Sequence, residues 1–60
     1  MELWRYEGKT VRVVTHDGNI FEGPARDYTS ALDNEPHGAC ISVGIHELLE
    51  SEIAQIRAID

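Results

Sequence analysis

Apolar and polar positions alternate in the first half of the chain in the way that a half-buried β-strand requires. Val11, Val13 and Thr15 fall on one face of an extended backbone, because successive side chains of a strand point to opposite sides. Residues 17–19 read Asp-Gly-Asn, which is typical of a tight turn because glycine accepts a positive φ. Residues 20–22 resume the alternation. The pattern therefore predicts a β-hairpin.

The pattern past the hairpin predicts more strands and one long loop. Pro24 has no backbone N–H, so we expect it at a sheet edge or bulge, with the strand bending after Gly23. Residues 28–38 are polar and rich in turn formers and predict a loop. A short strand is expected over 39–43, with Ile41 and Val43 on one face. Before the hairpin, residues 3–6 predict one short helical turn that Trp4 anchors on the sheet.

The hairpin carries a motif in two parts, Gly-Lys-x-Val-x-Val followed by Asp-Gly-x-x-Phe-x-Gly. Its residues are Gly8, Lys9, Val11, Val13, Asp17, Gly18, Phe21 and Gly23. This set resembles the first motif of the Sm and like-Sm proteins (LSM domain), here of the small bacterial or phage type. The resemblance implies a mostly β, Sm-like fold over residues 1–60 as one domain: a short N-terminal helix followed by a five-stranded, strongly bent antiparallel sheet, a small open barrel. It also implies a homo-oligomeric ring that associates with single-stranded RNA and acts in RNA metabolism.

The last sixteen residues, 45–60, have two interpretations. Five apolar side chains follow helical spacing, among good helix formers: Ile45, Leu48, Leu49, Ile53 and Ile56. By periodicity alone the chain would have three strands and a C-terminal helix. The resemblance instead implies two strands, 45–50 and 53–59, joined by a tight connection at 50–52, and we adopt that interpretation. The predicted oligomer interface is then Ile45, Leu48, Ile53 and Ile56.

The resemblance also places the RNA-contacting positions of the family. Counted from Gly23, they fall on a loop and on the triplet at 48–50, and the predicted RNA-binding residues at the ring mouth are Thr29, Leu32, Asp33, Asn34, Leu49 and Glu50. The family carries an arginine in that triplet, and here Glu50 brings negative charge instead.

The net charge of the chain argues against RNA as its partner. Eleven acidic residues oppose five basic ones, a formal net charge of -6, whereas nucleic-acid modules usually present a basic face. An acidic protein-interaction ring or scaffold that has lost RNA binding is therefore the alternative function. No apolar run is long enough for a membrane span, so we expect a cytoplasmic protein without a membrane partner. Cys40 has no second cysteine to pair with and should be a small buried hydrophobe.

Candidate chemistry is sparse. The three histidines, His16, His37 and His46, show no metal-ligand spacing, and no serine sits in a nucleophile-elbow context. We therefore predict no catalytic residue, no metal and no cofactor, and we do not expect an enzyme.

Overall fold

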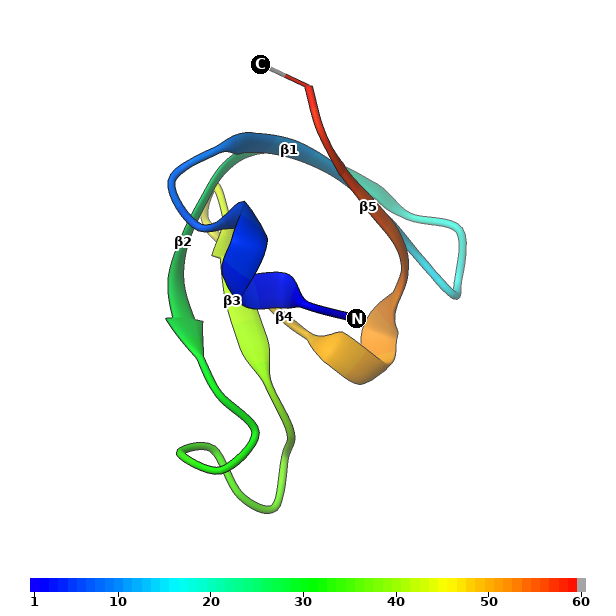
Figure 1. The fold of residues 1–60 in the computed structure, drawn as a ribbon. Coiled ribbons are helices and arrows are strands. Elements are labelled where there is room, and N and C mark those ends of the chain that lie inside the picture. The colour runs from blue at the N-terminus through cyan, green and yellow to red at the C-terminus, as the bar shows by residue number, and fades with distance from the viewer. Residues whose placement is uncertain (60) are drawn as a thin grey trace.

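Five antiparallel strands follow a single turn of 3-10 helix in the computed structural model, which describes residues 1–59 (Figure 1). The elements are η1 (Leu3–Tyr6), β1 (Thr10–Thr15), β2 (Ile20–Thr29), β3 (Cys40–Val43), β4 (His46–Leu49), η2 (Glu50–Glu52) and β5 (Ile53–Ala58). Each pair of neighbours in the sheet is antiparallel, and the order is β4-β3-β2-β1-β5. The predicted mostly β class and five strands are confirmed, and the sheet does not close into a barrel.

Strand β2 is shared between two halves of the sheet. Its first half pairs with β1, from Ile20 opposite Val14 to Pro24 opposite Thr10, and its second half pairs with β3 from Ala25 onward. The sheet curves around this strand, so that β1 and β5 arch over η1 in Figure 1.

The glycine and proline of β2 lie where the pairing changes from β1 to β3. A Cβ on Gly23 would stand 3.2 Å from the backbone nitrogen of Gly44, which is tighter than most Cβ contacts, so glycine favours this close approach of the two chain segments. The expectation of an edge or bulge for Pro24 was wrong, because β2 is the central strand and the register is regular there. The Pro24 carbonyl accepts a hydrogen bond from the Gly44 N–H at 3.0 Å, so the missing proline donor falls at the end of the β2–β3 ladder and costs little.

The core lies on the inner, concave side of the sheet. It consists of Leu3, Val11, Val13, Ala25, Ala39, Ile41, Val43, Leu48 and Ile53. Val11, Val13 and Thr15 are all buried, which confirms the predicted alternation along β1. The free thiol of Cys40 is buried as well, as expected.

The N-terminal turn is anchored by a different residue from the one expected. Leu3 is 1% exposed and belongs to the core, whereas Trp4 is 57% exposed. Consecutive side chains of a single turn point in different directions, so the turn places Leu3 against the core and turns Trp4 away from it. The prediction that Trp4 is the anchor was therefore wrong.

The C-terminal segment forms strands, not a helix. β4 and β5 are joined by the single turn η2, and β5 pairs with β1 along its length. Helical spacing was misleading here because Leu48 and Ile53 reach the same core from two different strands. Tertiary pairing outweighs the helix propensity of this segment. Within residues 1–59, no helix has the length and apolar character needed to cross a membrane.

Adjacent valines on β1 give a matched test of the two faces. Val13 is fully buried and Val14 is half-buried on the opposite face. We expect Val13→Ala to lower the free energy of unfolding by about 2 kcal/mol, because it removes buried methyl groups and leaves a cavity. Val14→Ala should cost less than about 1 kcal/mol. Urea unfolding at one fixed protein concentration measures both, and equal losses would contradict the assigned faces.

Candidate functional site

The outer strands β4 and β5 each have one edge that pairs with no strand among residues 1–59. Backbone N–H and C=O groups alternate in direction along a strand, so every second residue turns them toward the free edge. On β5, the Ile59 N–H donates to the Thr10 carbonyl at 2.8 Å, which leaves the N–H groups of Ile56 and Ala58 on the free side. An open edge of this kind is a template for another strand.

The free edge of β4 is shorter and partly blocked. The Glu50 N–H donates to the Ala39 carbonyl at 2.8 Å, so alternation turns the backbone groups of Glu47 and Leu49 outward. The Leu49 N–H already donates to Oε1 of Glu52 at 2.9 Å. Within the described part of the chain, Glu47 therefore carries the one outward N–H of β4 that a second strand could use.

The four predicted interface residues do not form one surface. Leu48 and Ile53 are buried in the core of the single chain, and Ile56 is half-buried against it. Ile45 differs, because it lies in the two-residue turn between β3 and β4 and is 95% exposed. An interface along the free edges would therefore rely on backbone groups, with Ile45 and Ile56 as its apolar side chains.

Three of the predicted RNA-binding residues lie together at one end of the sheet. Thr29 and Leu49 flank Cys40 on the neighbouring strands β2 and β4. Glu50 follows directly and bonds through its N–H to Ala39 on the strand between them. The structure thus brings together positions that are about twenty residues apart in the sequence.

The other three lie in the loop that connects β2 and β3, which extends away from the sheet at the bottom of Figure 1. Leu32 is 77% exposed there. The Asp33 N–H donates to Oγ of Ser30 at 3.2 Å, and the Asn34 side-chain amide donates to the Gly38 carbonyl at 2.8 Å. The amide N–H of Asn34 therefore closes its own loop.

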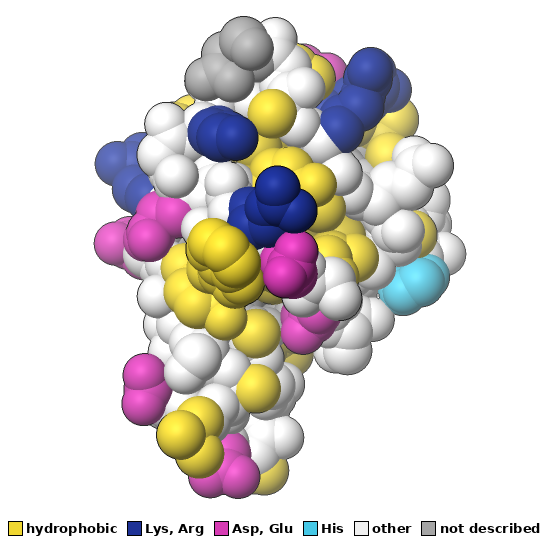
Figure 2. Space-filling view, viewed as in Figure 1, with side chains coloured by type: hydrophobic (Ala, Val, Ile, Leu, Met, Phe, Trp, Pro, Cys, Tyr) yellow, Lys and Arg dark blue, Asp and Glu magenta, His cyan; other side chains and the backbone are white. Residues whose placement is uncertain are grey.

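The loop between β2 and β3 and the segment from β4 to η2 are both acidic. Residues 27–39 and 45–52 contain no Lys or Arg, and the acidic side chains of these two stretches are Asp27, Asp33, Glu35, Glu47, Glu50 and Glu52. Glu50 makes one ion pair, with the Met1 amine at 3.3 Å. In Figure 2 the protruding loop likewise shows acidic and apolar side chains and no basic ones.

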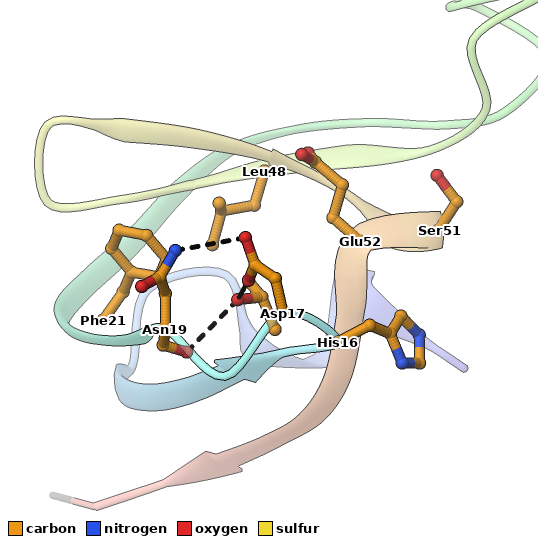
Figure 3. A pocket seen from close by; sticks show the side chains of 8 residues that line it. His16, Asp17, Asn19, Phe21, Leu48, Ser51 and Glu52 are labelled. Atoms are coloured by element: carbon orange, nitrogen blue, oxygen red, sulfur yellow. Dashed lines mark hydrogen bonds between the residues drawn. The ribbon is translucent and has the colours of Figure 1, made fainter.

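A pocket of about 290 Å³ opens between the β1–β2 turn and η2 (Figure 3). Its lining consists of Thr15, His16, Asp17, Asn19, Phe21, Leu48, Ser51 and Glu52. The two sides of the pocket are tied together by a hydrogen bond from the His16 N–H to the Glu52 carbonyl, at 3.0 Å.

Asp17 is the most strongly held side chain of this pocket. The Thr15 hydroxyl donates to Oδ1 of Asp17, and the Asn19 side-chain amide donates to Oδ2 at 3.2 Å (Figure 3). The Thr15 hydrogen bond, followed by one from the Asn19 backbone, holds the pKa of the Asp17 carboxyl below its ordinary value of 3.8. These bonds orient Asp17 for the turn, which is a structural role.

The sequence pattern missed a larger groove that follows β5. It has a volume of about 700 Å³ and is lined by Met1, Tyr6, Arg12, Val14, Ala54, Gln55, Ile56 and Arg57. The strand register brings Arg12 and Arg57 directly opposite one another. The sequence does show that each arginine alternates with the neighbouring apolar residues of its strand and so lies on the outer face. Only the pairing of β1 with β5 shows that the two arginines are neighbours.

The three histidines belong to no metal-binding cluster in the described part of the chain. Among residues 1–59, no three His, Cys, Asp or Glu side chains come together as a metal-binding group. His46 packs its ring against Phe21, with the centroids 4.7 Å apart, and His16 and His37 lie exposed in turns.

Comparison of the chain with protein-family models, with curated proteins and with solved structures found no match.

Removal of the Thr15 hydroxyl should change the ionisation of Asp17. Thr15→Val keeps the side-chain shape, and we expect the pKa of Asp17 to rise toward 3.8, as measured by carboxyl ¹³C NMR titration. Thr29→Val serves as the control, because Thr29 lies in another strand and should leave the Asp17 titration unchanged. An unaltered pKa in Thr15→Val would contradict the assigned cause.

The same carboxyl predicts a pH dependence of stability. A carboxyl whose pKa is lowered by folding stabilises the fold above its unfolded pKa, and that stabilisation is lost as pH falls through the folded value. The difference in unfolding free energy between wild type and Asp17→Asn should therefore be constant near neutral pH and shrink below about pH 3.8. Asn-Gly preserves the turn, so a pH-independent difference would count against this linkage.

Proposed function

We propose that this chain is an Sm-like subunit of a homo-oligomeric ring, in which β4 of one copy pairs with β5 of the next, and that the ring associates with single-stranded RNA. The motif in β1 and β2 supports the family. The observation that carries the ring is the sheet order, because it leaves β4 and β5 as two open edges at opposite ends of one sheet. Each copy can then extend the sheet of its neighbour on both sides, and a heterologous contact of this kind closes when the rotation between copies allows it.

The small size of the chain also supports assembly. A domain of 60 residues buries only about 60% of the surface that its unfolded chain exposes, so its fold gains from a partner. Pairing of the two edges would satisfy the outward backbone groups of Glu47, Ile56 and Ala58, and it would cover the exposed Ile45 if the neighbouring copy reaches the β3–β4 turn.

The RNA role is supported by the position of the loop between β2 and β3, which lies beside one end of the sheet. Thr29, Leu49 and Glu50 lie at one end of the sheet, next to the loop that carries Leu32 and Asn34, so the residues that match the family's RNA-contacting positions are close enough to act as one surface. In a ring, this surface would be repeated once per subunit.

The second candidate function is an acidic protein-interaction ring or scaffold. It is favoured by the absence of Lys and Arg from residues 27–39 and 45–52, and by Glu50 at the position where the family has arginine. A carboxylate is a poor partner for a nucleotide phosphate, whereas an acidic loop with an exposed leucine suits a protein with a basic, partly apolar surface.

Blocking the free edge of β4 tests the ring. Glu47→Pro removes the one outward N–H of β4 that remains available, and proline is tolerated on an edge strand whose N–H faces solvent. We expect native mass spectrometry to show a ring for wild type and a monomer for Glu47→Pro, with similar β-sheet circular dichroism. Glu47→Gln keeps the N–H and should keep the ring. A ring of unchanged mass in the proline variant would rule out pairing through β4.

Oligonucleotide binding separates the two candidate functions. We expect the wild-type ring to bind labelled oligouridine at low salt, with affinity falling as salt rises, because phosphate contacts release counterions. Oligoadenosine of equal length tests base preference. A ring that binds neither oligonucleotide at high protein concentration would remove the RNA role and leave the acidic scaffold.

A further inference from the structure

Arg12 and Arg57 form the one directly opposed pair of like charges in the described strand registers. They are cross-strand partners on β1 and β5. The register of these two strands shifts once, between Val14 and Thr15, and is regular at Arg12. Side chains of directly opposed residues lie on the same face, with Cβ atoms about 5 Å apart. Both arginines are out of phase with the buried Val11 and Val13, so they stand on the outer face of the sheet.

The charge of this pair is only partly neutralised. Arg12 contacts Glu22, its cross-strand neighbour on β2, with 3.7 Å between Nη1 and Oε2. The contact is long and solvent-exposed, and such surface ion pairs contribute little. Among residues 1–59, no carboxylate forms an ion pair with Arg57. Two cations and one anion therefore leave a locally positive spot on a chain of net charge -6.

The two arginines border a groove. They line the outer-face part of the groove of about 700 Å³ along β5, together with the amide of Gln55 and the half-buried Val14. The groove also includes Tyr6 and Ile56, which pack against the core on the other face. Gln55 is opposite Val14 and two residues from Arg57, so its amide can donate on the same face. In Figure 2 the Lys and Arg side chains lie mainly in the upper half of the view, where β1 and β5 run, and most acidic side chains lie below them.

We propose that Arg12 and Arg57 form a phosphate-binding site that holds the backbone of single-stranded RNA on the outer face of β1 and β5. The inference rests on the RNA role proposed above and assigns the phosphate contacts to a place other than the acidic loop. Two adjacent guanidinium groups can each donate a fork of N–H bonds to phosphate oxygens. A phosphate between them would also relieve the repulsion of the opposed cations.

The site is compatible with a ring joined at the edges. Strand pairing at the free edge of β5 uses backbone groups in the plane of the sheet, whereas strand side chains stand roughly perpendicular to that plane. Arg12, one strand further in, keeps its place on the face. In a ring the site would recur once per subunit, so a single RNA chain could contact several copies.

Neutral substitutions in the full-length protein test the site against a matched arginine. We expect Arg12→Gln and Arg57→Gln each to weaken binding of labelled oligouridine about two- to fivefold at low salt. Each should also reduce the slope of log affinity against log salt by about 0.7, as expected for one lost phosphate contact to a single strand. Arg26→Gln is the control, because Arg26 lies exposed on β2 opposite Ser42 and should leave both values unchanged.

Competition experiments test whether the site is specific for phosphate, and native mass spectrometry tests whether binding requires the ring. Inorganic tripolyphosphate should compete with oligouridine in wild type, and competition by polyglutamate at equal charge would overturn the assignment to phosphate. Wild-type binding that persists unchanged in both glutamine variants would overturn the site and leave the proposed RNA role in place. A ring that binds neither oligouridine nor tripolyphosphate would overturn both. Arginine-dependent binding by a monomer would support the site and remove the ring.

Discussion

The structure depends on one strand that serves two halves of the sheet. β2 is ten residues long and pairs with β1 up to Pro24 and with β3 from Ala25 onward. It therefore links β1 and β5 on one side of the sheet to β3 and β4 on the other. The change of partner requires a close approach between Gly23 and Gly44, which any Cβ at Gly23 would oppose. Because β2 turns the sheet back on itself, side chains from β1, β3, β4 and β5 meet on one concave side, and Leu3 fills the space between them.

The same topology determines where the molecule is open. A sheet built outward from β2 ends at β4 on one side and at β5 on the other, and neither edge is paired within residues 1–59. The fold limits this exposure in part, because the Glu52 side chain accepts a hydrogen bond from the Leu49 N–H and because β4 has only four residues. Exposed edges invite pairing, and a short chain gains burial from it, so the two open edges are the physical basis of the proposed ring.

Charge is segregated over this framework. The loop between β2 and β3 and the segment from β4 to η2 are acidic, whereas Arg12 and Arg57 stand together on the far strands β1 and β5. The candidate site could be predicted from the sequence only in part. Thr29, Leu49 and Glu50 do lie together, but Asn34 uses its amide to close its own loop, and Leu48 and Ile53 are core residues of the single chain. Counting along a motif gives the position of a residue on the backbone, and the neighbours of its side chain depend on the rest of the fold.

Local pattern by itself determined the hairpin, its turn and the buried face of β1, because the alternation of Val11, Val13 and Thr15 has the two-residue period of a strand. It could not decide the segment from Ile45 to Ile59, where five apolar residues together follow helical spacing, yet Leu48 and Ile53 reach the core from separate strands. Nor could it tell that Leu3 rather than Trp4 is buried, that Pro24 lies in the central strand, or that Arg12 faces Arg57. These features follow from which strands pair and in what register, and that choice minimises the free energy of the whole sheet rather than of any one segment.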